Sequence, residues 1–342
     1  MPGTDVNILF GGSSSERRVS VASAQHVSAV LDEAAAWFLA PTGAVHIVGR
    51  DELARFEKPF ERDFSPSAPA AFPTLVAAVE TQPSRVWFLA LHGGEGEDGT
   101  IQRMLEMRNI AFTGPGADAS ARAFDKEVAK EVAANAGVRI AKSVHLSKDP
   151  KVMREALRDL LSIYGRLVAK PVAGGSSVGL FFVGSPAEAE RVAREIEEAE
   201  EPYLAEEFVS GPELTVGVVD GTAGPRALPP SEVRLEAGRA FDYEGKYLGK
   251  GTQEITPAEV APEVTRAAQE LALAAHAALG CEGYSRTDVI VSPSGPVFLE
   301  LNTLPGLTRR SFIPQQLAVE GTSMLSFLEG QIALARRRRD RA

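Results

Sequence analysis

Acidic and amide side chains alternate along two short segments near the end of the chain, in a pattern that could bind a cation. The stretch YSRTDVIVSPSGPVFLELNTLPG, residues 284–306, contains a Pro-Ser-Gly turn between two apolar-polar runs. This pattern predicts a hairpin of strands Arg286–Ser292 and Pro296–Asn302. One face is then apolar and packs in a core, and it carries Val289, Val291, Val297 and Leu299.

A turn centred on Ser294 places polar residues opposite each other on the remaining face. Asp288 then faces Glu300, and Arg286 faces Asn302, because residues two apart on a strand share a face. Two facing carboxylates repel each other, and Mg²⁺ bound by carboxylate and amide oxygens would remove that repulsion. The hairpin predicts a metal site at Asp288, Glu300 and Asn302, with an ordinary solvated face as the alternative.

Composition restricts the class of protein that these strands belong to. The chain has 342 residues, of which 44% are hydrophobic and 24% charged, as expected for a soluble globular protein of two or three domains. The net charge of −10 argues against a nucleic-acid or anionic-membrane partner. The Arg336–Arg339 run is interpreted as a frayed, solvated helix end. With no signal peptide and no membrane-spanning run, we expect a cytoplasmic protein, and the single Cys281 excludes an internal disulfide.

The N-terminal segment predicts the start of a doubly wound α/β domain with a parallel sheet. A strand at Val6–Phe10 runs into GGSSSE and then an amphipathic helix. Glu16 is either a ligand-binding residue or part of a capping box with Ser13. The glycines do not follow G-x-G-x-x-G, so a nicotinamide dehydrogenase fits poorly.

A second strand, Val86–Leu91, ends in His92 and the polar turn GGEGEDG. Ligands of open α/β sheets bind beyond the carboxyl ends of strands, so this turn is a site candidate. His92 either faces a ligand or stabilises the loop.

A lysine precedes a glycine-rich turn in the middle of the chain. Lys170 lies on the expected strand Leu167–Pro171, and AGGSSVG follows it and includes Ser176 and Ser177. Backbone N–H groups and hydroxyls in such a turn can bind phosphate, and the lysine adds a positive charge. The spacing is not that of a Walker loop.

Two further segments offer polar groups to a nucleotide. Glu206 and Glu207 lie on the expected strand Tyr203–Val209, and Glu213 follows in the turn SGPE. These carboxylates either accept hydrogen bonds from adenosine or face water from an edge strand. The polar stretch Phe241–Pro257, FDYEGKYLGKGTQEITP, has no core-forming pattern and is expected to be a structureless lid.

These motifs, together with Lys126, occur in an order that resembles the ATP-grasp ligases. FGGSSSERRVS, ALHGGEGEDGT, the lid Lys-Tyr and NTLPGLT…S resemble the D-alanine–D-alanine ligase family in particular, over about Asn7 to Phe327. The resemblance implies an ATP-grasp fold with three domains, the first α/β and the other two α+β. Their expected limits are 1–115, 116–207 and 208–342, with the lid at 241–257.

The resemblance also implies a role for each matching residue. ATP would bind Lys126, Lys170, Ser176, Ser177, Glu206, Glu207, Val209, Glu213 and Lys246, with two Mg²⁺ or Mn²⁺ ions on Asp288, Glu300 and Asn302. Glu16, Ser176, Tyr247, Arg286 and the Gly306 N–H would serve catalysis, and His92, Ser311 and Phe312 would bind substrate. The implied reaction joins two D-alanines through a D-alanyl phosphate for peptidoglycan precursor synthesis, in a homodimer.

Two departures affect the expected substrate and loop. Gly174 stands where the family commonly has a glutamate, and Arg309-Arg310 precede Ser311 where a small residue or Pro and then His are usual. D-Ser or D-lactate is therefore an alternative second substrate, although the lid Lys-Tyr favours an amine acceptor. A nucleotide-binding regulatory protein with a decayed site is the alternative from another class.

Overall fold

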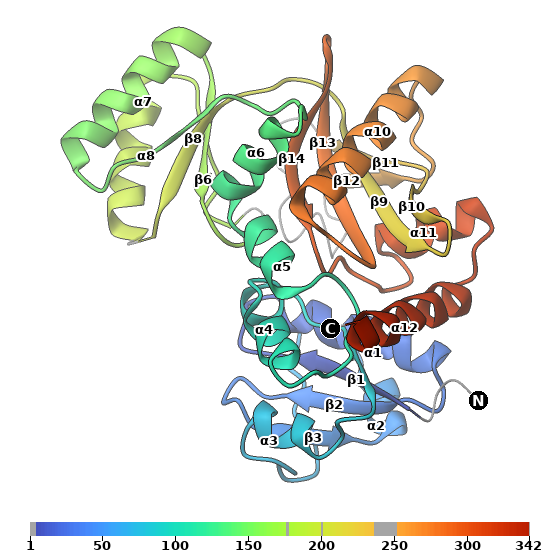
Figure 1. Ribbon diagram of the computed structural model, residues 1–342. Coiled ribbons are helices and arrows are strands. Elements are labelled where there is room, and N and C mark those ends of the chain that lie inside the picture. Colours follow the sequence, from blue (N-terminus) through green and yellow to red (C-terminus); the bar gives the residue numbers. More distant parts are fainter. Residues whose placement is uncertain (1–4, 176–177, 200, 236–251, 342) are drawn as a thin grey trace.

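The computed structural model describes residues 5–175, 178–199, 201–235 and 252–341, which form three β-sheets with helices packed against them (Figure 1). No helix within those ranges is long and apolar enough to span a membrane. The elements are β1 (Val6–Gly11), α1 (Arg17–Val30), β2 (Ala35–Leu39), β3 (Val45–Val48), α2 (Arg50–Arg55), α3 (Leu75–Glu80), β4 (Val86–Leu89), η1 (Gly94–Gly96), α4 (Thr100–Glu106), α5 (Ala117–Phe124), α6 (Lys126–Asn135), β5 (Ser143–His145), α7 (Pro150–Tyr164), β6 (Leu167–Pro171), β7 (Phe181–Val183), α8 (Pro186–Ala199), β8 (Tyr203–Glu207), β9 (Glu213–Gly221), β10 (Gly224–Ala227), β11 (Ser231–Leu235), β12 (Thr252–Ile255), α10 (Pro262–Leu279), β13 (Tyr284–Ser292), β14 (Gly295–Asn302), α11 (Phe312–Glu320) and α12 (Met324–Arg341).

The first sheet has the order β3-β2-β1-β4 and forms the core of the N-terminal part. β1 runs parallel to β2 and β4, as the doubly wound pattern predicts, but β3 is antiparallel to β2 at the edge. The strand β2 was not predicted from the sequence. The core of this sheet includes Phe327, Leu328 and Ile332 from α12, so the last helix of the chain packs beside α1 on the first sheet (Figure 1).

The second sheet has the order β5-β8-β6-β7 and is antiparallel throughout. Its apolar residues form a separate core with α7 and α8, which stand together away from the first sheet (Figure 1). The opposite face of β6 and β8 is therefore available to line a site.

The third sheet has the path β12-β11-β9-β13-β14, with β10 paired to β9. Helices α5, α6 and α10 pack on it and share its core. α5 and α6 are separate helices, because Asp125 caps α6 by accepting hydrogen bonds from the N–H groups of Glu127 and Val128.

The hairpin β13–β14 confirms the predicted register at the end that carries Asp288 and Glu300. Arg286 pairs with Asn302 and Asp288 with Glu300. The turn is two residues long, because Ser292 pairs with Gly295, and a β-bulge then leaves Leu299 without a partner. Leu299 lines a cavity instead of the core, so its predicted packing is wrong.

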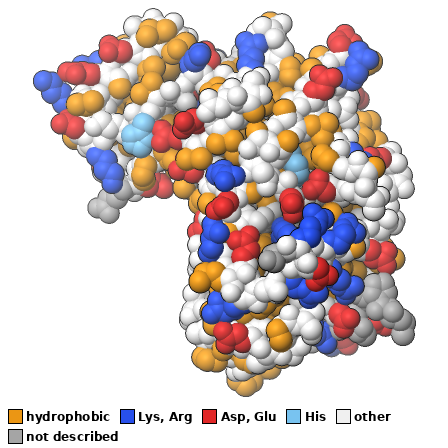
Figure 2. Space-filling model, viewed as in Figure 1, with side chains coloured by type: hydrophobic (Ala, Val, Ile, Leu, Met, Phe, Trp, Pro, Cys, Tyr) orange, Lys and Arg blue, Asp and Glu red, His pale blue; other side chains and the backbone are white. Residues whose placement is uncertain are grey.

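Two other predictions are corrected. Within the expected structureless lid 241–257, Thr252–Ile255 is a strand that pairs with β11. The Arg336–Arg339 run is not a frayed helix end, because α12 continues to Arg341 and Arg338 donates hydrogen bonds to the carbonyls of Phe112 and Gly114, both at 2.7 Å. Lys and Arg side chains gather around this end of α12 on the surface (Figure 2).

Candidate active site

A cavity of about 590 Å³ lies between the second and third sheets. It has an apolar lining from Val168, Leu180, Phe182 and Ile290, which suits a flat aromatic ring. Its lining also includes eight residues for which the sequence predicted ATP or metal binding: Lys126, Lys170, Glu206, Glu207, Val209, Glu213, Asp288 and Glu300.

A buried charged group occupies one wall of this nucleotide cavity. Glu206 accepts hydrogen bonds from Lys170, at 2.7 Å, and from Lys130. Lys130 was not predicted, because a lysine in the middle of a helix carries no signal of burial. Burial lowers the pKa of Lys130, and Glu206 opposes that effect. For Glu206 the two lysines outweigh burial and lower its pKa, so the carboxylate is ionised.

The neighbouring Lys126 reaches the glycine-rich loop. Its ammonium donates a hydrogen bond to the carbonyl of Gly174 at 2.5 Å. Gly174 and Gly175 both line the nucleotide cavity. This hydrogen bond joins the loop to α6. Lys126 and Lys170 lie beside it and could donate hydrogen bonds to phosphate oxygens.

The metal-binding role of the hairpin stays a prediction, and the surroundings of Asp288 show which groups would share the site. Asp288 accepts two hydrogen bonds from Arg286, at 2.9 and 2.7 Å, and one from Thr215. Among the described residues no group of three or more His, Cys, Asp or Glu could hold a metal by itself. Two carboxylates and the Asn302 amide, completed by phosphate oxygens or water, fit the way proteins hold Mg²⁺.

A second cavity, of about 1060 Å³, adjoins the hairpin on the side of Arg286. Gly306, Ser311 and Phe312 line it together with Arg286, so four predicted site residues meet there. The Arg286 guanidinium lies 5.9 Å from the centre of the Phe312 ring. Since Arg286 also holds Asp288, this ion pair joins the second cavity to the nucleotide cavity.

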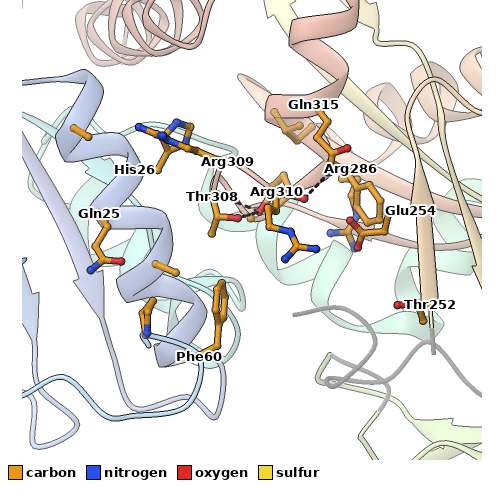
Figure 3. A pocket seen from close by; sticks show the side chains of 18 of the residues that line it. Gln25, His26, Phe60, Thr252, Glu254, Arg286, Thr308, Arg309, Arg310 and Gln315 are labelled. Atoms are coloured by element: carbon orange, nitrogen blue, oxygen red, sulfur yellow. Dashed lines mark hydrogen bonds between the residues drawn. The ribbon is translucent and has the colours of Figure 1, made fainter. Parts of the chain in front are cut away.

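Polar side chains from three parts of the chain face this second cavity. In Figure 3, Gln25 and His26 from α1 lie opposite Arg286 and Glu254, and Arg310 points into the space between them. Glu254, which was not predicted, has a pKa raised to about 7 by burial, although Arg310, Gln315 and Arg286 oppose the rise. The cavity can therefore present both positive groups and a carboxyl group to a small zwitterion.

Glu16 lies where the N-terminal sheet meets the glycine-rich loop. A small cavity of about 30 Å³ is lined by Glu16, Lys126, Gly175 and Asn302. The capping-box interpretation is wrong, since Glu16 occupies the N-cap position of α1 and makes no side-chain cap hydrogen bond. Its carboxylate instead approaches Gly175, where an added Cβ would lie 3.1 Å from Oε2.

His92 is buried, and protein atoms contact both of its ring nitrogens. Nδ1 lies 2.7 Å from the Leu304 carbonyl oxygen and Nε2 lies 2.8 Å from the Ser23 hydroxyl. This is the loop-stabilising arrangement, and a direct substrate contact by His92 stays a prediction. Four other predicted residues, Ser176, Ser177, Lys246 and Tyr247, lie outside the described residues.

Family models match both parts of the chain. Residues 5–115 match the model described as D-ala D-ala ligase N-terminus, and residues 132–332 match D-ala D-ala ligase C-terminus. The chain belongs to the D-alanine–D-alanine ligase family. A D-alanine–D-alanine ligase from Leptospira biflexa serovar Patoc is 36% identical over 333 residues, which cover 93% of this chain and 95% of the relative.

Solved structures of ligases share the fold. The VanG D-Ala:D-Ser ligase from Enterococcus faecalis superposes with a TM-score of 0.79 at 27% identity, covering 96% of this chain and 98% of that one. The D-alanine–D-alanine ligase from Bacillus anthracis complexed with ATP superposes with a TM-score of 0.73 at 24% identity, covering 98% of each chain. The ATP-grasp fold predicted from the sequence is confirmed, while the domain limits 1–115, 116–207 and 208–342 stay a prediction.

Proposed function

We propose that this member of the D-alanine–D-alanine ligase family joins two D-alanines to D-alanyl-D-alanine with ATP, for peptidoglycan precursor synthesis. ADP and phosphate are the other products. The observation that supports this proposal most strongly is the meeting of two cavities at the Arg286–Asp288 ion pair. One cavity has the lining of a nucleotide site and the other that of a small-zwitterion site.

In the first step, a carboxylate oxygen of one D-alanine attacks the γ-phosphorus of ATP, and the bond from that phosphorus to ADP breaks. Lys126 and Lys170 offset the negative charge of the phosphates. Glu16, at the small cavity beside Gly175 and Asn302, would bind the ammonium of this D-alanine. Asp288, Glu300 and Asn302 would hold two Mg²⁺ or Mn²⁺ ions, which supply further charge neutralisation when bound.

In the second step, the amine of the other D-alanine attacks the carbonyl carbon of the D-alanyl phosphate. The ammonium group loses one proton to solvent or to a base before the attack, and the nitrogen loses a second proton after it. The tetrahedral oxyanion that forms then collapses and phosphate leaves. Arg286 and the Gly306 N–H donate to the oxyanion. Ser311 would bind the carboxylate of this second D-alanine. An added Cβ at Gly306 would lie 2.7 Å from Ser311 Oγ, so a side chain there would displace the Ser311 hydroxyl.

Four residues outside the described ranges complete the proposed site. Tyr247, Ser176 and Glu16 would form a network that keeps water from the acyl phosphate. Ser177 and Lys246 would contact the phosphates of ATP.

The lining of the second cavity supports one alternative, in which the second substrate is not D-alanine. Arg310 points into the second cavity and Glu254 faces it (Figure 3), and the VanG D-Ala:D-Ser ligase shares the fold. A hydroxyl-bearing acceptor such as D-Ser would find both a donor and an acceptor there. We favour D-alanine because of the lid Lys-Tyr.

The experiment is to incubate the purified protein with D-alanine, ATP and Mg²⁺ and to measure dipeptide and ADP. Parallel reactions offer D-Ser or D-lactate as the second substrate. Equal amounts of D-alanyl-D-alanine and ADP are expected. A folded protein that forms no dipeptide contradicts the proposal, and preferential formation of D-alanyl-D-serine or D-alanyl-D-lactate establishes the alternative.

The homodimer and the cytoplasmic location remain predictions from the resemblance and the sequence. Light scattering after size-exclusion chromatography measures the first, and a mass of one chain would contradict it.

A further inference from the structure

The loop after β14 carries Gly306, and side chains from the N-terminal part hold its backbone on both sides of that glycine. On the first side, the Leu304 carbonyl oxygen lies 2.7 Å from His92 Nδ1. The N–H of the same residue donates to Glu97 Oε1 at 3.1 Å. The other oxygen of Glu97 accepts the Gly93 N–H at 2.7 Å, so Glu97 joins the turn after β4 to the loop after β14.

The second side is held by helix α1. The Leu307 N–H donates to Ser23 Oγ at 3.2 Å. The carbonyl oxygen of Leu307 lies 2.7 Å from His26 Nδ1. Both backbone polar groups of Leu304 and both of Leu307 are thus bound by side chains, and Gly306 lies between them.

Hydrogen-bond chemistry fixes the roles of the atoms that connect the two sides. A carbonyl oxygen only accepts, so His92 Nδ1 carries a proton and donates to Leu304. Burial lowers the pKa of His92, which keeps the ring neutral and leaves Nε2 as an acceptor. Ser23 therefore donates its hydroxyl proton to Nε2, at 2.8 Å, while it accepts from Leu307. One continuous chain links Leu307 through Ser23 and His92 to Leu304.

We propose that Ser23, His26, His92 and Glu97 are positioning residues that fix the Gly306 N–H for the oxyanion of the second step. This inference rests on the proposed function. Pro305 has no N–H, so the loop has few backbone donors of its own with which to hold its shape. A donor aimed at a developing charge contributes only when its direction is fixed beforehand, and here four side chains fix it.

The test uses Ser23→Ala in the full-length protein, with Ser28→Ala as the matched control. Ser23 is fully buried on α1. Ser28 is buried on the same helix, and among the described residues its hydroxyl has no hydrogen-bond partner. Both substitutions remove one buried hydroxyl, but only the first removes a contact to the loop. Ser23→Thr restores the hydroxyl.

Hydrogen exchange of residues 303–308 is measured first, because it requires no activity. Ser23→Ala is expected to speed exchange in this segment by about five- to tenfold, the effect of losing about one hydrogen bond. Ser28→Ala is expected to leave it unchanged. Unchanged exchange in Ser23→Ala overturns the proposal, even if the wild-type protein forms no dipeptide and the proposed function fails.

The second measurement is the steady-state kinetics of dipeptide formation. Ser23→Ala is expected to lower kcat by about tenfold with the KM for ATP unchanged, because the Gly306 N–H acts only in the transition state. Ser23→Thr is expected to recover most of the rate. An equal loss in Ser28→Ala, or a raised KM for ATP with kcat intact, contradicts the positioning role. If Ser23→Ala does not fold, Glu97→Gln replaces it, because an amide can accept only one of the two N–H groups that Glu97 accepts.

Discussion

The buried group of Lys130, Glu206 and Lys170 supports a strong prediction about stability. Side-chain exposures of 2%, 5% and 9% leave these three charges almost without water. Glu206→Gln removes the only negative charge of the three and leaves two ammonium groups next to each other. Removing one partner of a buried ion pair costs about 3–5 kcal/mol. Because a glutamine oxygen still accepts one hydrogen bond, we expect about 3 kcal/mol.

The assay is thermal unfolding followed by circular dichroism, without nucleotide. At about 2–4 °C per kcal/mol, the range for chains well above 100 residues that unfold as one unit, Glu206→Gln should lower Tm by about 6–12 °C. Glu207→Gln is the matched control one position along β8. Its carboxylate accepts the Lys142 N–H at 2.9 Å at the protein surface, so a change below about 2 °C is expected.

A double variant tests the cause. Lys130→Met in the Glu206→Gln protein removes one of the two adjacent ammonium groups and should restore part of the lost Tm, since apolar groups can replace buried ion pairs at little cost. The reasoning is refuted if Glu206→Gln and Glu207→Gln lower Tm equally, or if Lys130→Met lowers it further by its full single-variant amount.

Four further predictions concern the site. Arg286→Ala should lower kcat for dipeptide by about 10²–10³ with the affinity for ATP kept, and a loss below about tenfold in steady-state assays would contradict the oxyanion role. Arg310→Ala should raise the KM of the second D-alanine by about tenfold and leave that of ATP unchanged, as initial rates at varied D-alanine would reveal. Chelation with EDTA should abolish activity and added Mg²⁺ should restore it, whereas activity that survives chelation would argue against the metal site. Burial raises the pKa of Glu97 from 4.5 to about 7, so its stabilising contribution is present at acid pH and is lost as pH rises through about 7. Tm of the wild type should therefore fall more steeply from pH 5 to 8 than Tm of Glu97→Gln, and parallel profiles would refute this.

The sequence predicted the polar face of the hairpin because strand alternation is strictly periodic. The pairing of Asp288 with Glu300 was nevertheless reached through two errors that cancel. The turn is one residue shorter than expected, and the bulge at Leu299 restores the register. A leucine in a strand gives no sign of a bulge, so its position depends on packing that a single sequence does not contain.

The polar segment before α10 shows a second reason why some elements could not be predicted from the sequence. Thr252–Ile255 has no apolar face, and its strand exists because β11 offers an edge to pair with. The positioning residues were missed for a related reason. Ser23 resembles any small residue on a helix, and its partner is a backbone N–H more than 280 positions later, which no side-chain pattern encodes. Glycine loops and charged residues were found because their chemistry is visible in their types.

The place of α12 has a consequence for synthesis on the ribosome. The first sheet is complete in the nascent chain once β4 has emerged, yet part of its apolar cover comes from α12, which is made after the other two sheets. Until α12 has been made, the apolar face that it covers is exposed to solvent or to a chaperone. A stop codon before residue 324 would therefore expose part of the core of the first sheet, although the missing helix lies far from that sheet in the sequence.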